Sequence, residues 1–216
     1  EIDFDIGGES DDFGDTPFGQ RRRLNVRGGT IEGAELRGQV ANHGIEYELT
    51  LDNGAQEIEQ IGFLKSNDEL IFMRNCGISP GPGVPARVVL GFEAKSDGAY
   101  TFLNTGRYIG TRSYDPDLEQ LRLKVYEVSG AADANGALRV VKPGGRPAQR
   151  WDCKASAAAR GAELYRAMVD LDPSWMTVGE TGRGTRNAIT IVGGTFGGKL
   201  SGRVRPGGAD YQLFGA

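Results

Sequence analysis

Short runs of alternating apolar and polar residues recur throughout the first 128 residues of the chain. In one of these runs, Ile45, Tyr47 and Leu49 alternate with Glu46 and Glu48. This period of two is that of a β-strand, whose successive side chains point to opposite faces of a sheet. Many short strands separated by turn residues predict an all-β fold, as an antiparallel sandwich or barrel. The predicted strands cover residues 2–6, 24–26, 45–51, 61–64, 69–75, 87–94, 99–104, 107–111 and 120–128.

The pattern changes after residue 128. Residues 129–154 are rich in Gly, Ala and Pro, which is typical of a linker. Residues 155–171 are rich in alanine and place Leu164, Met168 and Leu171 at helical spacing, which predicts a helix. Strand-like runs resume after this segment, so we expect a linker with one helix over residues 129–177.

An internal repeat links the two ends of the chain. Residues 19–49 and 184–213 align with one gapped position, and twelve positions are identical. Glycines at fixed places between apolar residues predict the same strand–turn–strand geometry twice. The second copy contains only the opening strands of the unit, so its other strands lie outside this sequence, are supplied by another chain, or are replaced by pairing with the first unit. In the numbering of the first copy, the identical residues are Gly19, Arg21, Gly28, Gly29, Thr30, Gly33, Leu36, Gly38, Val40, Gly44, Tyr47 and Leu49.

The second copy resembles a known family. The strings GGT at 193–195, LSGRV at 200–204 and PGGADYQ at 206–212 are similar to the opening signature of the domain of unknown function 3237. The resemblance covers about residues 2–128 and 178–216. It implies a small antiparallel, lipocalin-like β-barrel with an interior cavity, complete over 1–128 and begun again over 178–216. The family has no assigned general activity, so the resemblance implies a fold and leaves the function open.

Composition and charge narrow the classes of function. The chain has 34 glycines, which fits many tight turns and bulges, and its net charge of −4 gives no overall attraction to nucleic acid or to an anionic membrane. Two distant cysteines, Cys76 and Cys153, and the single His43 do not make a zinc site, so we expect no metal and no cofactor. No apolar run could span a bilayer. We expect a cytoplasmic protein, and export stays open because the chain begins at Glu1.

Three charged residues are candidates for catalysis. Glu46 and Asp210 occupy equivalent places in the two copies of the repeat, on the face opposite the neighbouring tyrosines. If this face lines the barrel lumen, loss of solvent raises the carboxyl pKa and suits the group to general acid or base work. Arg74 could stabilise developing negative charge. The competing interpretation places these side chains in solvent or in structural ion pairs.

Several polar and aromatic residues are candidates for ligand binding. Asn75 and Asn104 lie on predicted strands and could orient a ligand, although turn or strand hydrogen bonds are equally consistent with their positions. The aromatic candidates could line a pocket, with core packing as the alternative. The full set of predicted ligand-binding residues is Asn75, Asn104, Tyr47, Tyr100, Phe102, Tyr211 and Gln212.

These features support three hypotheses about function. The first is an enzyme that performs acid/base chemistry, without a metal, on a small apolar or phenolic molecule inside the barrel, as an isomerase, cyclase, lyase or hydrolase. The second is a non-catalytic carrier of a small molecule, because small barrels commonly enclose one ligand. The third is an assembly module, in which residues 184–213 complete a neighbouring copy by strand exchange in a homo-oligomer.

Overall fold

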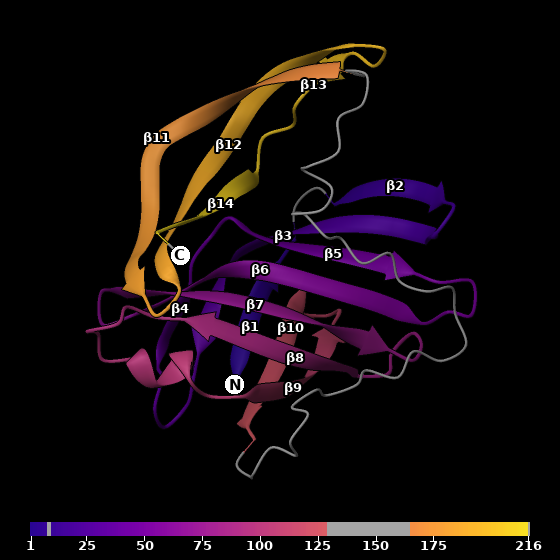
Figure 1. Ribbon diagram of the computed structural model, residues 1–216. Helices are drawn as coiled ribbons and strands as arrows, with labels where there is room; N and C mark the ends of the chain where they lie inside the picture. Colours follow the sequence, from indigo (N-terminus) through magenta and orange to yellow (C-terminus); the bar gives the residue numbers. More distant parts are fainter. Residues whose placement is uncertain (8–9, 129–164, 216) are drawn as a thin grey trace, which may run out of the picture.

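The computed structural model describes residues 1–7, 10–128 and 165–215, which form two antiparallel β-sheets (Figure 1). The larger sheet has ten strands and the smaller has four. The strands of the larger sheet are β1 (Ile2–Ile6), β2 (Asp11–Thr16), β3 (Gly19–Ile31), β4 (Gly38–Val40), β5 (Gly44–Thr50), β6 (Gln56–Ser66), β7 (Glu69–Ser79), β8 (Ala86–Glu93), β9 (Tyr108–Asp115) and β10 (Gln120–Glu127).

The larger sheet closes on itself as a barrel. Strand β1 pairs with β10 on one side and with the second half of β3 on the other. Strand β5 joins the first half of β3 to β6, so eight strands form a ring in the order β1-β10-β9-β8-β7-β6-β5-β3. The predicted all-β fold with an antiparallel barrel is therefore confirmed. Strand β2 pairs only with the first half of β3 and extends that hairpin beyond the ring.

The barrel interior is filled by the inward side chains of each strand. At one end, the interior is apolar and includes Phe4, Leu64 and Ile71, which are almost fully buried. The 3-10 helix η1 (Thr101–Asn104) lies at this end and contributes the buried Leu103. The strand predicted at 99–104 is thus wrong. The Asn104 side chain both accepts from the N–H and donates to the C=O of Ala94, at 2.7 and 2.9 Å, which holds this segment as a turn instead of a strand.

The smaller sheet also departs from the sequence prediction. It consists of β11 (Tyr165–Thr181), β12 (Gly184–Gly198), β13 (Gly202–Arg203) and β14 (Gly208–Phe214). The helix predicted over 155–171 is wrong for residues 165–171, which begin β11, whereas residues 155–164 lie outside the described residues. Backbone pairing of 165–171 with β12 outweighs the helical propensity of the segment.

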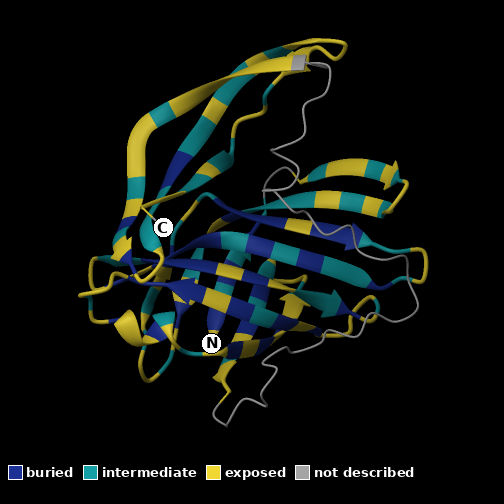
Figure 2. Ribbon diagram, viewed as in Figure 1, coloured by how far each residue is buried: buried dark blue, intermediate teal, exposed yellow. Residues whose placement is uncertain are grey.

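The smaller sheet packs against the outside of the barrel. The rings of Phe63 and Phe72, on the outer faces of β6 and β7, meet Val178, Ala188 and Tyr211 of the smaller sheet. Figure 2 shows that most of the smaller sheet beyond this contact is exposed or half-buried, in contrast to the barrel strands. In the described part of the chain, no helix has the length and apolar character needed to cross a membrane.

Candidate functional site

The polar face of β5 points into the barrel. Glu46 lies opposite Leu24 of β3 and Gln60 of β6 in the strand ladders, and all three side chains share the inner face. Glu46 is fully buried and Glu48 is nearly so. Tyr47, between them, points outward and is partly exposed. The inner face of this strand therefore carries two carboxylates, which alternation alone could not assign to inside or outside.

An ion pair spans the lumen. The carboxylate of Glu46 accepts a hydrogen bond from the guanidinium of Arg112 on β9, and both side chains are buried. Strands β5 and β9 are separated by three strands on either side of the eight-strand ring, so the two residues approach from opposite walls. An eight-stranded barrel is only wide enough for side chains to meet in this way.

A second ion pair continues this line of charges toward solvent. Arg22 of β3 donates to Glu48 Oε2 from Nη2 and Nε, at 2.5 and 3.1 Å. The Arg22 side chain is 44% exposed, whereas the Glu48 side chain is buried. The two ion pairs therefore lie in a row from the centre of the barrel to its surface, with the two glutamates as neighbours between the two arginines.

Burial raises the pKa of Glu46 to about 7, which is the largest single influence on this carboxyl group. The positive charge of Arg112 opposes this rise in pKa, and the negative charge of Glu48 adds to it. Glu46 is thus close to half-protonated near neutral pH. A carboxyl group in this state can either accept or release a proton without a large change in free energy.

Two amide side chains lie beside Glu46 on the inner face. Asn75 of β7 donates from Nδ2 to Oε1 of Gln60 at 2.6 Å, and both residues are buried. Whichever way the two amides are turned, one hydrogen bond between them leaves one donor and one acceptor without a partner. Within the described residues, the buried Gln60 Nε2, Asn75 Oδ1, Glu46 Oε2 and Arg112 Nε make no hydrogen bond. Such groups call for a ligand or water, because leaving them unpaired is costly.

The space beside these amides is small. Gly44 and Gly62 face each other across β5 and β6, and they border a void of about 170 Å³ that also touches Gln60, Met73 and Phe4. The void is too narrow for a water-sized sphere. The interior cavity implied by the family resemblance is therefore a narrow gap in a barrel that is otherwise filled by side chains. A molecule bound there must displace side chains on entry.

Of the predicted catalytic residues, only Glu46 lies in the lumen. Arg74 points outward from the middle of β7 and forms an exposed ion pair with Glu59. Asp210 is exposed on β14, where it accepts a hydrogen bond from Gln212 at 2.6 Å. The structure thus separates these three charged residues from one another.

The predicted ligand-binding residues are also dispersed. Asn75 lies in the lumen beside Gln60, whereas Asn104 is bonded to the backbone of Ala94. The Tyr100 hydroxyl is hydrogen-bonded to Ser66 and Asn67 in the core, at 2.6 and 2.7 Å. The remaining predicted residues lie outside the barrel lumen: Tyr47, Phe102, Tyr211 and Gln212.

Four residues at the lumen were not predicted from the sequence as part of a site: Arg112, Gln60, Glu48 and Arg22. Together with Glu46 and Asn75 they form the lumen cluster. Arg112 falls in a polar stretch of β9, and its partner Glu46 is 66 positions away. The available signal was alternation, because Tyr108, Gly110 and Arg112 share one face of that strand. A polar residue on an otherwise inward face marks a buried polar group, but only the closed barrel identifies which face is inward.

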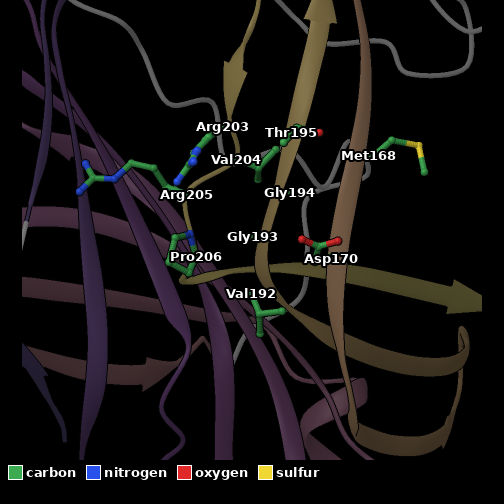
Figure 3. Close-up of a pocket in the computed structure, with 10 residues that line it drawn as sticks. All are labelled: Met168, Asp170, Val192, Gly193, Gly194, Thr195, Arg203, Val204, Arg205 and Pro206. Atoms are coloured by element: carbon green, nitrogen blue, oxygen red, sulfur yellow. The ribbon is translucent and has the colours of Figure 1, made fainter.

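A larger pocket lies in the second sheet. It has a volume of about 530 Å³ and is bordered by β11, β12 and the segment 203–206 (Figure 3). Its polar side chains are separated: Arg205 pairs with Asp11 of β2, and Asp170 lies on the opposite wall. No buried unpartnered polar atom lies among its described lining residues. The lumen cluster is the better candidate site, because its unpartnered atoms are buried and converge.

No metal site is apparent in residues 1–7, 10–128 and 165–215. These residues contain no group of three or more His, Cys, Asp and Glu side chains placed to hold an ion. Cys76 is an exposed free thiol, and Cys153 lies outside the described residues. Burial and the charge of Glu59 raise the pKa of the Cys76 thiol, against the opposing effect of Arg74.

Comparison with known proteins gives a family and a fold. The model of a family described as "Protein of unknown function (DUF3237)" matches residues 1–128 and 162–216. No curated protein matches the chain.

Three solved structures are similar in fold. A protein with unknown function from Clostridium acetobutylicum ATCC 824 is 22% identical, covers 59% of this chain and 94% of its own, and has a TM-score of 0.53. A conserved protein of unknown function from Rhodopseudomonas palustris is 21% identical, with 58% and 91% covered and a TM-score of 0.52. A beta-barrel like protein from Acinetobacter baumannii AYE is 22% identical, with 58% and 90% covered and a TM-score of 0.51. At this level of identity the likeness shows the barrel fold alone.

Proposed function

We propose a function for this chain, which belongs to the DUF3237 family, described only as of unknown function. The lumen of its barrel is an acid/base site where Glu46 exchanges a proton with a small molecule. One observation carries the proposal. Glu46, Gln60, Asn75 and Arg112 come from four strands, and each brings a buried polar atom with no hydrogen-bond partner among the described residues to the inner face. A fold retains such unpaired groups at a cost, and functional sites are where that cost is commonly borne.

The four residues divide the chemical work. The Glu46 carboxylate accepts a proton from a C–H or O–H of the substrate, and the electron pair left behind moves to an adjacent substrate oxygen. Arg112 donates from Nε to that oxygen and stabilises its negative charge. Glu46 then returns the proton at a second position or to the leaving group. The Gln60–Asn75 pair offers one donor and one acceptor that orient the substrate.

This scheme fits isomerisation, cyclisation or elimination of a small molecule that is mainly apolar. It fits hydrolysis when Glu46 takes the proton from a water molecule, whose oxygen adds to the substrate while Glu46 returns the proton to the leaving group. The gap beside Gly44 and Gly62 is narrow and bordered by Phe4 and Met73, so it favours a flat apolar or phenolic group near the polar cluster.

A non-catalytic carrier is the second candidate. A carrier of an apolar molecule needs an apolar interior with its carboxylates outside. Here Glu46 and Glu48 both lie inside, and burial holds the pKa of Glu46 at about 7. These features favour proton transfer over simple carriage.

The experiment has two stages. A thermal-shift screen of a metabolite library identifies ligands of the wild-type protein, and the hits are repeated on Asn75→Ala, Glu46→Gln and the control Asp210→Asn. We expect Asn75→Ala to abolish the shift and Asp210→Asn to leave it unchanged. Turnover of the hits is then measured, and we expect Glu46→Gln to lower kcat by roughly 100-fold or more while binding persists.

Two results would contradict the proposal. A ligand whose thermal shift is the same in wild type and Asn75→Ala binds outside the lumen cluster. A ligand that binds in the lumen and is turned over equally by wild type and Glu46→Gln excludes Glu46 as the proton carrier. Binding in the lumen with no turnover of any hit would favour the carrier.

A further inference from the structure

The second sheet repeats the strand pairing of the barrel's opening strands. β12 pairs with β14 in the same register as β3 pairs with β5. Each residue of β12 corresponds to the residue of β3 numbered 165 lower, and each residue of β14 to the residue of β5 numbered 164 lower. β12 likewise pairs with β13 as β3 pairs with β4, with the same differences in residue number. The matched pairs include Gln20↔Thr50 with Thr185↔Phe214, Val26↔Gly44 with Ile191↔Gly208, and Thr30↔Gln39 with Thr195↔Arg203.

The long strand β11 repeats β1 and β2 together. It pairs with β12 as β1 and β2 pair with β3, and register shifts in β1 and β2 have counterparts at equivalent positions of β11. The threonine that closes the β2–β3 turn bonds to a glycine carbonyl at 2.6 Å, and its counterpart in β11 does so at 2.7 Å. The matched features are the register shifts at Asp5/Ile6 and Asp170/Leu171, those at Asp12/Gly14 and Thr177/Gly179, and the bonds Thr16–Gly19 and Thr181–Gly184.

The inner face of this repeated segment keeps the apolar pattern of the barrel wall but is only partly covered. Phe4 and Ile6 are 1% and 5% exposed inside the barrel, whereas their counterparts Val169 and Leu171 are 43% and 45% exposed. The face opposite this one contacts Phe63 on the barrel through Tyr211 and Ala188. The second sheet therefore rests on the barrel by its outer face. It leaves Val169 and Leu171 of its inner face open to solvent, whereas Ile189, the counterpart of Leu24, is buried.

We propose that β11–β14 is an alternative partner for β6–β10 of the same chain, able to close the barrel in place of β1–β5. The two segments present matching edges, because the barrel joins β1 to β10 and β5 to β6. In the alternative barrel, the first part of β11 pairs with β10 and β14 pairs with β6. Asp210 then takes the place of Glu46 and faces Arg112, which keeps an acid opposite the buried arginine.

The connection between the segments permits this closure within one chain. β10 ends at Glu127 and β11 begins at Tyr165, so β10 and β11 can become neighbours with the intervening residues as their link. A tethered segment has a high effective concentration, which favours its own chain over a second copy as the partner.

The charges explain why β1–β5 is the segment that closes the barrel here. Asp3 pairs with Arg122 at 2.9 Å, and its counterpart in β11 is Met168. The Arg22–Glu48 pair has as its counterparts two uncharged residues, an asparagine and a glutamine. The Arg22–Glu48 pair lies within β1–β5 and stays with that segment, whereas the Asp3–Arg122 pair joins β1 to β10. The alternative closure thus loses the Asp3–Arg122 pair and has no ion pair at the position of Arg22 and Glu48, and it is the minor form.

The test uses the full chain and three variants. The first carries Phe4→Asp and Gly29→Val, which disable β1–β5: a charge enters the core, and a Cβ at Gly29 (φ +138°) collides with the carbonyl of Asp3. The second carries Val169→Asp and Gly194→Val, the matched changes in β11–β14, where Gly194 has φ +135°. The third carries all four changes. Amide hydrogen exchange of β6–β8 reports whether the barrel is closed.

We expect β6–β8 to stay protected in the first and second variants and to lose protection in the third. In the first variant, exchange of residues 208–214 slows by roughly tenfold or more while that of residues 44–50 accelerates. Three results overturn the proposal. The first is loss of protection of β6–β8 in the first variant, and the second is continued protection of β6–β8 in the third variant. The third is continued protection of residues 44–50 in the first variant. A first variant that sediments as a dimer or larger assigns the contact to a second copy and overturns closure within one chain.

Discussion

The segments β1–β5 and β11–β14 have matching strand registers, bulges and turns, yet one is the wall of a closed barrel and the other lies open on its surface. The difference shows which properties are local. Pairing and bulges follow from glycines and alternation within each segment. Burial follows from the strands that close over the segment, and these are supplied to β1–β5 by β6–β10.

The chemistry of the two segments differs for the same reason. Glu46 and Asp210 occupy equivalent positions, but only Glu46 is enclosed, and burial raises the pKa of that carboxyl to about 7. Asp210 is exposed and bonded to Gln212. A candidate acid/base group is thus created by closure of the sheet and not by the local sequence alone.

The largest expected effect comes from the core of the closed segment. Phe4→Ala removes a buried ring and leaves a cavity, and we expect it to lower the free energy of opening the β1–β3 pair by about 3–5 kcal/mol. Val169→Ala, at the matched position of the open segment, should cost below about 0.5 kcal/mol. Amide hydrogen exchange of β1 and β11 measures both. Equal costs would show that the inner face of the second segment is covered in solution.

The next effect is on the pH dependence of stability. Folded Glu46 holds its proton up to about pH 7, whereas an ordinary glutamate in the unfolded chain ionises near 4.5. Between these values the folded state binds more protons, so the free energy of unfolding falls as pH rises, by up to about 3 kcal/mol from this group. Below about pH 4.5 the group is protonated in both states and contributes no slope.

Glu46→Gln should remove this fall, and Asp210→Asn, its counterpart in the open segment, should leave it intact. Urea titrations at pH 5 and pH 8 measure the difference for each protein. If the free energy of unfolding of Glu46→Gln fell with pH as steeply as that of the wild type, the buried carboxyl would not be the titrating group. The two segments would then not differ in the pKa of their equivalent carboxyl groups.

The alternation of the sequence predicted at least part of each of the eight strands in the ring, because alternation is a pattern within a few residues, but it did not predict β2 or β4. The site was only partly predictable. Glu46 and Asn75 were identified by type and position, but Arg112 was not, because its contact with Glu46 exists only after β5 and β9 are brought to opposite walls.

The two errors of secondary structure have the same origin. Residues 165–171 end the segment predicted as a helix from its alanine content and apolar spacing, but their pairing with β12 decides their conformation. Residues 99–104 were predicted as a strand, but the hydrogen bonds of Asn104 to Ala94 hold residues 101–104 as a 3-10 turn. In both cases a contact with residues outside the segment overrides its local preference.

A smaller effect is expected where the open segment is attached to the barrel. Arg186 donates to Glu93 from Nη2 and Nε at 2.7 and 3.0 Å and lies 4.4 Å from the centre of the Phe72 ring. Arg186→Ala leaves the buried Glu93 without its main partner, and we expect a loss of roughly 2 kcal/mol in the stability of this contact. Limited proteolysis within β11 and β12 measures it.

The matched control is Arg21→Ala, since Arg21 is the same residue at the equivalent position of the closed segment and forms no ion pair with the described residues. It should change proteolysis of β11 and β12 little. If both variants released the second sheet equally, the attachment would not depend on the Glu93 pair.

The smallest effect separates the two faces of the barrel wall. Arg74 points outward and pairs with Glu59, and both side chains are well exposed. Solvent screens such a pair, so Arg74→Ala should cost below about 0.5 kcal/mol in the free energy of unfolding and leave ligand binding unchanged. Arg112→Ala, on the inner face, should instead abolish ligand binding, because it removes the Nε donor proposed to bind the substrate oxygen. Urea titration and the thermal shift of a lumen ligand measure the two variants together. If Arg74→Ala lost ligand binding to the same extent as Arg112→Ala, the ligand site would lie on the outside of the barrel. The contrast between the enclosed and the open segment would then no longer explain the position of the site.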